Sequence, residues 1–433
     1  MICETLAARP PLGWNSYDAF NAAVTEEQVR QNADVMAAHL APLGYEYVVV
    51  DYCWYYPHVG SQQCPSQRDG FIPPLCMDEF GRCVPAPDRF PSAAGGRGFT
   101  ELADYVHGRG LKFGIHVMRG ISKEAVHRRL PVEGTATTAD RIADPATACR
   151  WLDHNVGVNM SKRGAQAYYD SVFRLYASWG VDYVKVDDMV RMDPYLDAEI
   201  EAVHAAVARC GRPMVLSLSA GVPRLIEKAE HVKAHSHLWR ISDDFWDEWR
   251  LLREQFEYCE RWQGYGGPDS WLDVDMLTIG KLSLNASNGP PRYSRFSDDE
   301  LLTMLSLWYI FRSPLMIGGD LRQMRTSDLD LLCNGEALAA NQRGEDPREL
   351  FRTSDEAAWW SRAPDADARF LALFNLGDTP RDVSVRPTDI GLDGRVAARD
   401  VWQRRDIGVC EGRFTREIRP HGAGLYRLSA CRR

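Results

Sequence analysis

The sequence lacks both a long hydrophobic run and an excess of positive charge. No segment of the 433 residues approaches the roughly 20 apolar residues that a membrane-spanning helix requires. Lysine and arginine number 51 against 60 acidic residues, which gives a net charge of -9, and the basic residues form no cluster. Because phosphate contacts need clustered lysine and arginine, we expect neither a nucleic acid nor a membrane as a partner.

A signal peptide and paired cysteine motifs are missing as well. The first residues, Met1 to Thr5, have neither the basic nor the apolar region of a secretory signal. The 11 cysteines are an odd number without CxxC spacing, as expected for free thiols in a reducing compartment. We therefore expect a cytoplasmic protein, or a secreted one if the sequence has been trimmed. Cys64, Cys76 and Cys83 lie close together, so a disulfide or a metal site among them stays open.

Strand-like apolar runs alternate with helical patterns up to about residue 330, and no GxGxxG or GxxxxGK[ST] phosphate loop interrupts them. We expect strands at 12–16, 45–51, 112–118, 182–187, 214–219, 238–242, 271–276 and 314–318. Eight such units predict an α/β fold, a (β/α)8 TIM barrel, over residues 1–340. Ser297-Asp-Asp-Glu300 predicts a capping box at the start of its last large helix.

The segment 341–433 has a different pattern. Short alternating runs at 357–361, 370–375, 382–385, 399–402 and 423–428 are separated by glycine, proline and aspartate. This pattern predicts a C-terminal antiparallel β-sandwich domain. Within the barrel, two long insertions at 55–91 and 119–164 follow the second and third strands. Since ligands bind at the C-terminal ends of barrel strands, we expect both insertions to wall the pocket.

The predicted strand ends carry an unusual concentration of acids. They present Trp14, Asn15, Asp51, Tyr52, Trp54, His116, Arg119, Lys185, Asp187, Asp188, Ser217, Ser219, Arg240, Asp243, Asp244, Asp273, Asp275 and Asp320. Aromatics form 10% of the chain, including 13 tryptophans, and several lie beside these polar groups. Flat apolar rings next to hydrogen-bonding groups suit a sugar, whose faces are apolar and whose edges carry hydroxyls.

Several acids around one pocket suit more than one function. In glycoside hydrolysis one carboxylate attacks the anomeric carbon, and a second carboxyl protonates the leaving oxygen. Alternatively, Asp187, Asp244 and Asp275 would bind Mg²⁺ in a metal-dependent barrel enzyme. A barrel that binds sugar without catalysis is a third interpretation. The interleaved aromatic residues favour a carbohydrate, an oligosaccharide or a glycoside, as the substrate.

Motifs along nearly the whole chain resemble those of glycoside hydrolase family 27, the α-galactosidase and α-N-acetylgalactosaminidase group. They are PLGWNS at 11–16, DYCW at 51–54, GLKFGI at 110–115, WGVDYVKVD at 179–187, WRISDD at 239–244, DML at 275–277 and RSPL at 312–315. The resemblance implies a barrel, a C-terminal β domain and a retaining, exo-acting α-glycosidase. It also implies double displacement through a glycosyl-enzyme, without cofactor or metal.

By this resemblance, Asp187 corresponds to the nucleophile and Asp244 to the general acid/base, with Asp243 its neighbour. The two carboxyls are then expected to face each other across one dry cavity. Contacts with the sugar are expected from Trp14, Asp51, Tyr52, Trp54, His116, Lys185, Ser219, Arg240 and Asp275. Homo-oligomerisation stays open.

The chain also departs from the family pattern. Asp51-Tyr52 replaces two adjacent aspartates that grip the O4 and O6 side of galactose. Ser219 lies where the family has a glutamate that contacts the 2-position, and His116 replaces a tyrosine. An α-galactosidase-like activity is the first expectation. An α-glucoside-specific, isomaltodextranase-like enzyme and an α-N-acetylgalactosaminidase are alternatives within the family.

Overall fold

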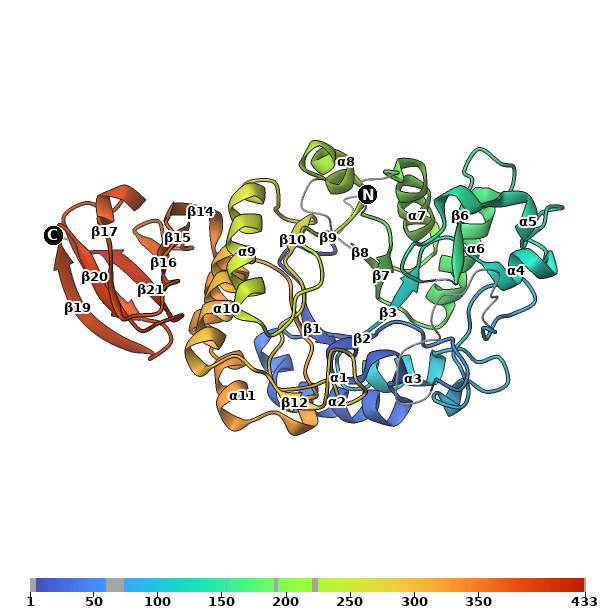
Figure 1. Cartoon of the computed structure of the whole chain (residues 1–433), viewed down its shortest axis with the longest axis horizontal. Helices are drawn as coiled ribbons and strands as arrows, with labels where there is room; N and C mark the ends of the chain where they lie inside the picture. The colour runs from blue at the N-terminus through green and yellow to red at the C-terminus, as the bar shows by residue number, and fades with distance from the viewer. Residues whose placement is uncertain (1–4, 60–73, 153, 191–193, 220–224, 432–433) are drawn as a thin grey trace.

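A computed structural model describes residues 5–59, 74–152, 154–190, 194–219 and 225–431 (Figure 1). Eight parallel strands form its central sheet: β1 (Leu12–Asn15), β2 (Tyr47–Val50), β3 (Lys112–Met118), β7 (Tyr183–Asp187), β8 (Val215–Leu218), β9 (Leu238–Arg240), β10 (Trp271–Asp273) and β13 (Leu315–Ile317). Their order is β10-β9-β8-β7-β3-β2-β1-β13. A parallel bridge between Leu277 and Ile317, just after β10, closes the sheet into a barrel.

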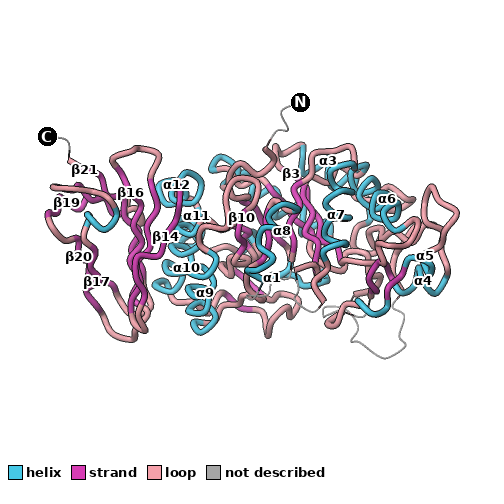
Figure 2. The backbone as a smooth tube through the Cα atoms, turned by 90° about the horizontal axis from the view of Figure 1, so that it is seen from above, coloured by secondary structure: helices cyan, strands magenta, loops and turns pink. Residues whose placement is uncertain are grey.

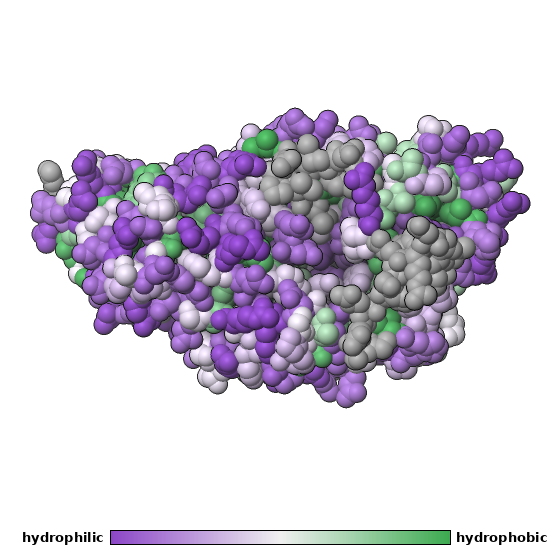
Figure 3. Space-filling model, in the orientation of Figure 1, coloured by the Kyte–Doolittle hydropathy of each residue, from purple (hydrophilic) through white to green (hydrophobic). Residues whose placement is uncertain are grey.

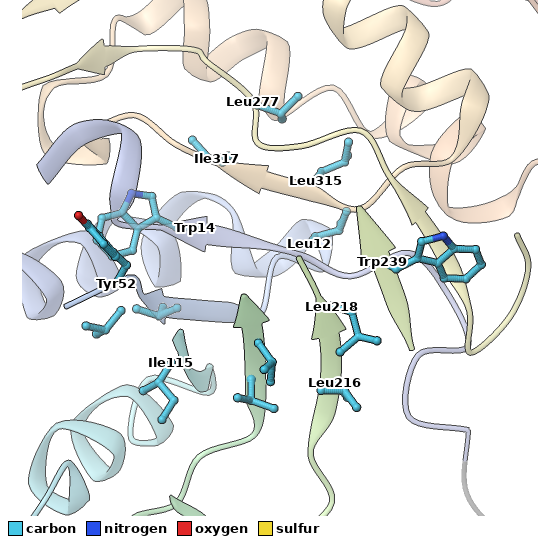
Figure 4. Packing of buried hydrophobic residues seen from close by; sticks show 14 of the residues in the cluster. Leu12, Trp14, Tyr52, Ile115, Leu216, Leu218, Trp239, Leu277, Leu315 and Ile317 are labelled. Carbon is cyan, nitrogen blue, oxygen red and sulfur yellow. The ribbon is translucent and has the colours of Figure 1, made fainter. Parts of the chain in front are cut away.

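All eight predicted strands are therefore confirmed; β3 matches its predicted bounds, and the other seven are one to three residues shorter than predicted. The barrel strands are almost entirely buried, and their side chains pack against one another and against the surrounding helices (Figure 4). Trp239 projects from β9 toward α9, where its ring meets Trp262 at 6.2 Å. β1 lies so close to β2 that a Cβ at Gly13 would be 2.3 Å from the carbonyl oxygen of Tyr47.

Helices surround the barrel. They are α1 (Tyr17–Phe20), α2 (Glu26–His39), α3 (Thr100–His107), α6 (Ala165–Ser178), α7 (Asp197–Arg209), α8 (Ala229–His235), α9 (Trp249–Trp262), α10 (Asp298–Phe311), α11 (Thr326–Leu332) and α12 (Gly335–Arg343). The capping box predicted for α10 is confirmed. The Ser297 hydroxyl accepts from the Glu300 amide at 3.2 Å, and the Glu300 carboxylate accepts from the Ser297 amide at 2.9 Å.

The insertion at 119–164 folds as a small lobe beside the barrel. It contains β4 (Ile121–Ser122), α4 (Lys123–Arg128), α5 (Ala139–Ile142), β5 (Ala143–Asp144) and β6 (Asn155–Val158), with a strand order of β4-β6-β5. A further hairpin pairs β11 (Lys281–Leu282) with β12 (Arg292–Tyr293). Cys64 lies outside the described residues. Cys76 and Cys83 are free thiols in the described chain, so no disulfide joins this pair.

The C-terminal segment forms two antiparallel sheets. A six-stranded sheet has the order β14-β15-β16-β21-β18-β19, and a second sheet pairs β17 with β20. The strands are β14 (Glu345–Arg352), β15 (Glu356–Arg362), β16 (Ala368–Asn375), β17 (Arg381–Val385), β18 (Arg395–Asp400), β19 (Arg405–Glu411), β20 (Phe414–Ile418) and β21 (Ala423–Ala430). The predicted barrel followed by a β-sandwich is thus confirmed. The boundary at 340 stays a prediction; α12 ends at Arg343 and β14 begins at Glu345.

One helix joins the two parts. α10 is buried on almost every side because it packs both on the barrel and on the sheet that contains β16 and β21 (Figure 2). Phe311 at its end contacts Trp359 at 5.9 Å, and Phe256 on α9 contacts Phe374 at 4.9 Å. None of the described helices is long and apolar enough to cross a membrane. The face shown in Figure 3 is mainly hydrophilic, with small separate hydrophobic patches.

Candidate active site

A cavity of about 400 Å³ opens at the C-terminal ends of the barrel strands. Its described lining consists of Tyr17, Asp18, Asp51, Tyr52, His116, Trp151, Lys185, Asp187, Arg240, Asp243, Asp244, Phe245, Trp246, Asp275 and Met276. The set includes both predicted catalytic acids and six of the nine predicted sugar contacts. The strand ends therefore bring together residues as far apart in the chain as Tyr17 and Met276, as a closed parallel barrel requires.

Asp187, the last residue of β7, is held as a carboxylate. The Nε2 atom of His116 lies 3.0 Å from its Oδ2, and the Asp188 amide donates to its Oδ1 at 2.5 Å. Because a carboxylate only accepts, Nε2 of His116 carries the hydrogen. Burial alone would raise the pKa of Asp187, but the hydrogen bond from His116 and the charge of Lys185 outweigh it and lower the pKa. An ionised, oriented carboxylate in a cavity is a suitable nucleophile.

The backbone after Asp187 is held in an unusual conformation. Asp188 has a φ of 60°, in the left-handed region that residues other than glycine seldom occupy. Its buried side chain binds Arg119, whose Nη2 lies 2.5 Å from Asp188 Oδ2 and whose Nη1 lies 2.9 Å from Glu199 Oε2. This buried network fixes the end of β7. Arg119 thus supports the site from behind and lies outside the cavity lining.

On the next wall, Asp51 and Lys185 form a buried ion pair. Lys185 Nζ lies 3.2 Å from Asp51 Oδ2, and the side-chain amide of Asn15 donates to the same oxygen at 2.7 Å. Burial would raise the pKa of Asp51, but Lys185 and His116 together with these hydrogen bonds lower it to about 2. The cavity therefore offers a permanent negative acceptor beside a permanent positive donor. Such a pair suits neighbouring sugar hydroxyls.

A third cluster surrounds Arg240 at the end of β9. Its Nη1 lies 2.8 Å from Asp275 Oδ1, and its Nη2 lies 3.2 Å from Asp244 Oδ1. Asp275 is buried, has a φ of 81°, and accepts a hydrogen bond from the Phe245 amide at 2.8 Å. Burial raises the pKa of Asp275 to about 6, although the charge of Arg240 opposes this. A buried carboxyl in a strained backbone conformation is characteristic of functional sites.

Asp244 differs from the expectation of a dry cavity. Its side chain is 63% exposed, whereas that of Asp187 is 13% exposed, so the two acids share one cavity but Asp244 lies at its mouth. The expectation of two water-excluded acids was wrong for Asp244 because the segment after β9 leaves this side open. The neighbouring Asp243 is also exposed, and its Oδ1 accepts from the Asp244 amide at 2.9 Å. Of these two acids in the described chain, Asp244 is the one that contacts Arg240.

Three predicted sugar contacts lie outside the described cavity lining. Trp14 is fully buried and donates from Nε1 to the Gly319 carbonyl at 2.9 Å, so it packs behind the cavity wall. Trp54 is also fully buried and donates to the His116 carbonyl at 2.6 Å. Ser219 is buried at the end of β8, with its amide bonded to the Val186 carbonyl at 2.9 Å, and lies outside the described lining.

Other residues take the place of these three. Tyr17, three residues after Trp14 and the first residue of α1, lines the cavity, and Trp151, Phe245 and Trp246 add further rings. The sequence around β1 gave no signal that Tyr17, rather than Trp14, would line the cavity. Trp151 belongs to the insertion at 119–164, so that insertion does wall the pocket. The described parts of the other insertion, 55–59 and 74–91, contribute nothing to the lining.

Tyr52 fills the end of the cavity next to the Asp51–Lys185 pair. Its ring is 9% exposed and contacts Tyr17 at 5.5 Å, His116 at 6.0 Å and Trp151 at 6.4 Å. This group of four rings makes a rigid apolar wall around a polar centre.

The acids of the cavity do not form a chelating group. In the described chain, no three carboxylates among Asp187, Asp244 and Asp275 and their neighbours bring donor atoms within 4.8 Å of one another. Instead, each of the three lies next to a cationic or ring nitrogen, from His116 or Arg240. The site therefore matches the glycosidase interpretation better than the Mg²⁺ interpretation.

A barrel with paired carboxyls, hydrogen-bonding cations and aromatic walls around one cavity defines a carbohydrate-processing enzyme. Residues 10–127 and 150–343 match the family model described as Alpha galactosidase A, and residues 354–428 match the Alpha galactosidase C-terminal beta sandwich domain. The chain therefore belongs to the α-galactosidase family of glycoside hydrolases. It is an α-galactosidase-like glycosidase of a family whose members act with retention of configuration.

Relatives cover almost the whole chain. An α-galactosidase from Cyamopsis tetragonoloba is 27% identical over 98% of this chain and 87% of its own length. Alpha-galactosidase A from Cellvibrio japonicus is 30% identical over 78% of this chain and 69% of its own. Among solved structures, a GH27 β-L-arabinopyranosidase from Geobacillus stearothermophilus is 45% identical, with a TM-score of 0.95 over 98% of this chain and 97% of that one. A second structure of that enzyme, in complex with arabinose, has 44% identity and a TM-score of 0.94 and covers 99% and 98% of the two chains.

Proposed function

We propose that the enzyme hydrolyses β-L-arabinopyranosides, with Asp187 as nucleophile and Asp244 as acid/base. The Asp187 carboxylate attacks the anomeric carbon while Asp244 gives its proton to the leaving oxygen. Water then attacks the glycosyl-enzyme, and Asp244 takes up the proton of that water. Lys185 and Arg240 donate to sugar hydroxyls in this scheme, and Asp51 accepts from them.

The position of Tyr52 supports β-L-arabinopyranose as the substrate sugar. β-L-Arabinopyranose has the ring configuration of α-D-galactopyranose but lacks the hydroxymethyl group. The Tyr52 ring, which contacts Tyr17 and His116, follows Asp51 in the chain and stands where a second carboxylate would otherwise bind the outer hydroxyls of galactose. A rigid aromatic side chain at this point leaves room for the hydrogen that β-L-arabinopyranose carries on its ring, but it would crowd the hydroxymethyl group that galactose carries there. The likeness to an arabinopyranosidase at 45% identity supports the same choice.

An α-D-galactosidase is the second candidate. The sugar-ring hydroxyls of the two substrates have the same configuration, so the Asp51–Lys185 pair would bind either of them. The family match and the plant and bacterial relatives named α-galactosidase favour this alternative.

The two candidates differ in their kcat/KM values on matched p-nitrophenyl glycosides. We expect β-L-arabinopyranoside to exceed α-D-galactopyranoside by at least about tenfold, since one misfitted carbon group is typically worth 10- to 200-fold. The α-glucoside and the α-N-acetylgalactosaminide should be poorer than both. Equal or faster hydrolysis of the galactoside by the wild type would reject the arabinoside preference and leave the retaining glycosidase intact.

Substitution at Tyr52 tests the cause of that preference. Tyr52→Ala removes the ring and should raise the galactoside-to-arabinoside ratio of kcat/KM by about tenfold or more. Tyr52→Phe is the matched control, because it keeps the ring and loses only the hydroxyl, and it should retain the wild-type ratio. If Tyr52→Ala leaves the ratio unchanged, another residue sets the specificity.

The pH dependence of kcat/KM should show the ionisation of Asp275. With its pKa raised to about 6 by burial, this carboxyl is mostly protonated below pH 6 and ionised above it. Only the ionised form makes the full charge-assisted bond that orients Arg240, so kcat/KM should rise as pH increases through about 6. Asp275→Asn cannot ionise and should lose this rise when kcat/KM is measured from about pH 4 to 8. A variant that retained the same inflection would assign it to a different group.

A further inference from the structure

A second cluster of polar side chains lies outside the barrel, between α7 and α8. It consists of Glu201 on α7 and His231 and His235 on α8, and the helices lie side by side in Figures 1 and 2. One oxygen of Glu201 and one ring nitrogen of each histidine all lie within 4.8 Å of one another. Nothing in the glycosidase mechanism uses these three residues.

Helical spacing places the two histidines on one face. Residues four apart on a helix lie above each other, and pairs of histidines at this spacing bind a metal ion together. His235 Nδ1 lies 2.7 Å from the carbonyl oxygen of His231, to which it donates. This bond fixes the ring so that its Nε2 keeps a free lone pair. A histidine that donates from one nitrogen to a backbone carbonyl has the usual orientation of a metal ligand.

His231 is oriented from the opposite side. Its Nδ1 lies 2.6 Å from the hydroxyl oxygen of Tyr195, and its Nε2 lies 3.3 Å from Glu201 Oε1. Two ligands bonded tetrahedrally to zinc at about 2.0–2.1 Å are separated by about 3.3 Å. The nitrogen and the oxygen therefore already stand at the separation that one ion would impose. A ring nitrogen of His235 lies within 4.8 Å of the ligand atoms of the other two residues.

We propose that Glu201, His231 and His235 bind a divalent transition-metal ion of the zinc type, with water as the fourth ligand. Imidazole and carboxylate ligands suit such an ion, and three protein ligands leave one position open. Without the ion, the Tyr195 hydroxyl donates to Nδ1 of His231, and Nε2–H donates to Glu201. On binding, the ring hydrogen moves from Nε2 to Nδ1 by exchange with solvent, and Nδ1–H then donates to Tyr195.

The surroundings indicate a structural effect. His204 packs its ring against His235 at 5.2 Å, and Lys228 Nζ lies 5.0 Å from the Tyr195 ring. α7 follows the strand that ends at Asp187, and α8 precedes the strand that ends at Arg240. An ion between them would cross-link two successive units of the barrel, so it should affect thermal stability and leave the chemistry of the cavity unchanged.

Metal binding by the untagged full-length enzyme tests this proposal. After treatment with EDTA and dialysis against micromolar ZnCl₂, elemental analysis should give one zinc per chain. The double variant His231→Gln/His235→Gln should lose this equivalent, and Tyr195→Phe should bind about 10-fold more weakly, as removal of an outer hydrogen bond usually does. His58→Gln is the matched control, because His58 is 88% exposed and lies in a different part of the fold.

Thermal unfolding supplies the second readout. Zinc should raise the Tm of the wild type and of His58→Gln but not that of the double variant, because a ligand stabilises only the state that binds it. kcat on the preferred glycoside should be the same with and without zinc. The proposal fails if the wild type takes up no zinc. It also fails if the double variant still binds one zinc per chain, because the ion would then be bound by other ligands such as the free thiols.

Discussion

Asp187→Asn is expected to lower kcat by about 10⁴- to 10⁶-fold, the range found when a catalytic nucleophile is removed. The amide has the size of the carboxylate but cannot form a glycosyl ester, so neither displacement takes place. It also still accepts the hydrogen bond from His116, so we expect the far-ultraviolet circular dichroism spectrum of the folded protein. A variant that retains most of its activity would remove Asp187 from the role of nucleophile.

Rescue by azide gives this experiment a positive result as well. In Asp187→Gly, azide would enter the space left by the side chain, attack the anomeric carbon and give a glycosyl azide of inverted configuration. The inversion would be read by NMR of the product. An azide product of retained configuration would instead assign Asp187 to proton transfer, since azide would then have attacked a glycosyl-enzyme.

The second large effect is expected for Asp244→Asn, and it should depend on the leaving group. A poor leaving group such as an alkoxide needs its oxygen protonated, so hydrolysis of an alkyl glycoside should slow by about 10²- to 10⁴-fold. A dinitrophenolate leaves without a proton, so formation of the glycosyl-enzyme from that substrate should be nearly unaffected. The comparison measures kcat/KM for both glycosides with the wild type and the variant.

The neighbouring acid provides a matched control. Asp243 is exposed and lines the same cavity, but Arg240 binds Asp244 at 3.2 Å. Asp243→Asn should therefore change kcat/KM far less than Asp244→Asn, with no dependence on the leaving group. If the two variants exchange these behaviours, the acid/base is Asp243, and the alignment of the WRISDD segment shifts by one residue.

The exposure of Asp244 bears on how this acid works. A side chain that is 63% exposed does not have a water-excluded environment in the free enzyme. Bound substrate has to supply that environment by covering the mouth of the cavity. The rings of Trp151 and Trp246 line the same cavity and would border the leaving group.

The barrel strands were predictable because buried parallel strands are short apolar runs bounded by turns. The same reasoning found β15, β16, β17, β18 and β21, although it placed β18 about four residues late. It missed β20, which pairs only with β17, and it missed β14 and β19, which lie at the two edges of the six-stranded sheet and are rich in charged residues. An edge strand pairs with a neighbour on one side only, and charged residues on such strands prevent pairing with another chain. Their sequences therefore show little apolar alternation.

The polar members of the site were easier to predict than the aromatic ones. Asp51, Lys185 and Arg240 had to lie at the strand ends because a buried strand does not tolerate unpaired charge. The buried positions of Trp14 and Trp54 outside the cavity lining could not be predicted, because a tryptophan beside polar residues suits either a pocket or a buried wall, and only the fold decides which. Asp18 illustrates the same limit, since burial raises its pKa well above the usual value although nothing around it in the sequence distinguishes it.

The apolar surface of α10 has a consequence for the independence of the two domains. On α10, Trp308 contacts Phe245 of the barrel and Phe311 contacts Trp359 of the C-terminal sheet. Cutting the chain near residue 345 would therefore leave apolar side chains of this helix facing water. The catalytic half is thus not a detachable module. A chimera with the C-terminal domain of another protein would therefore need a sheet whose apolar surface matches that of α10.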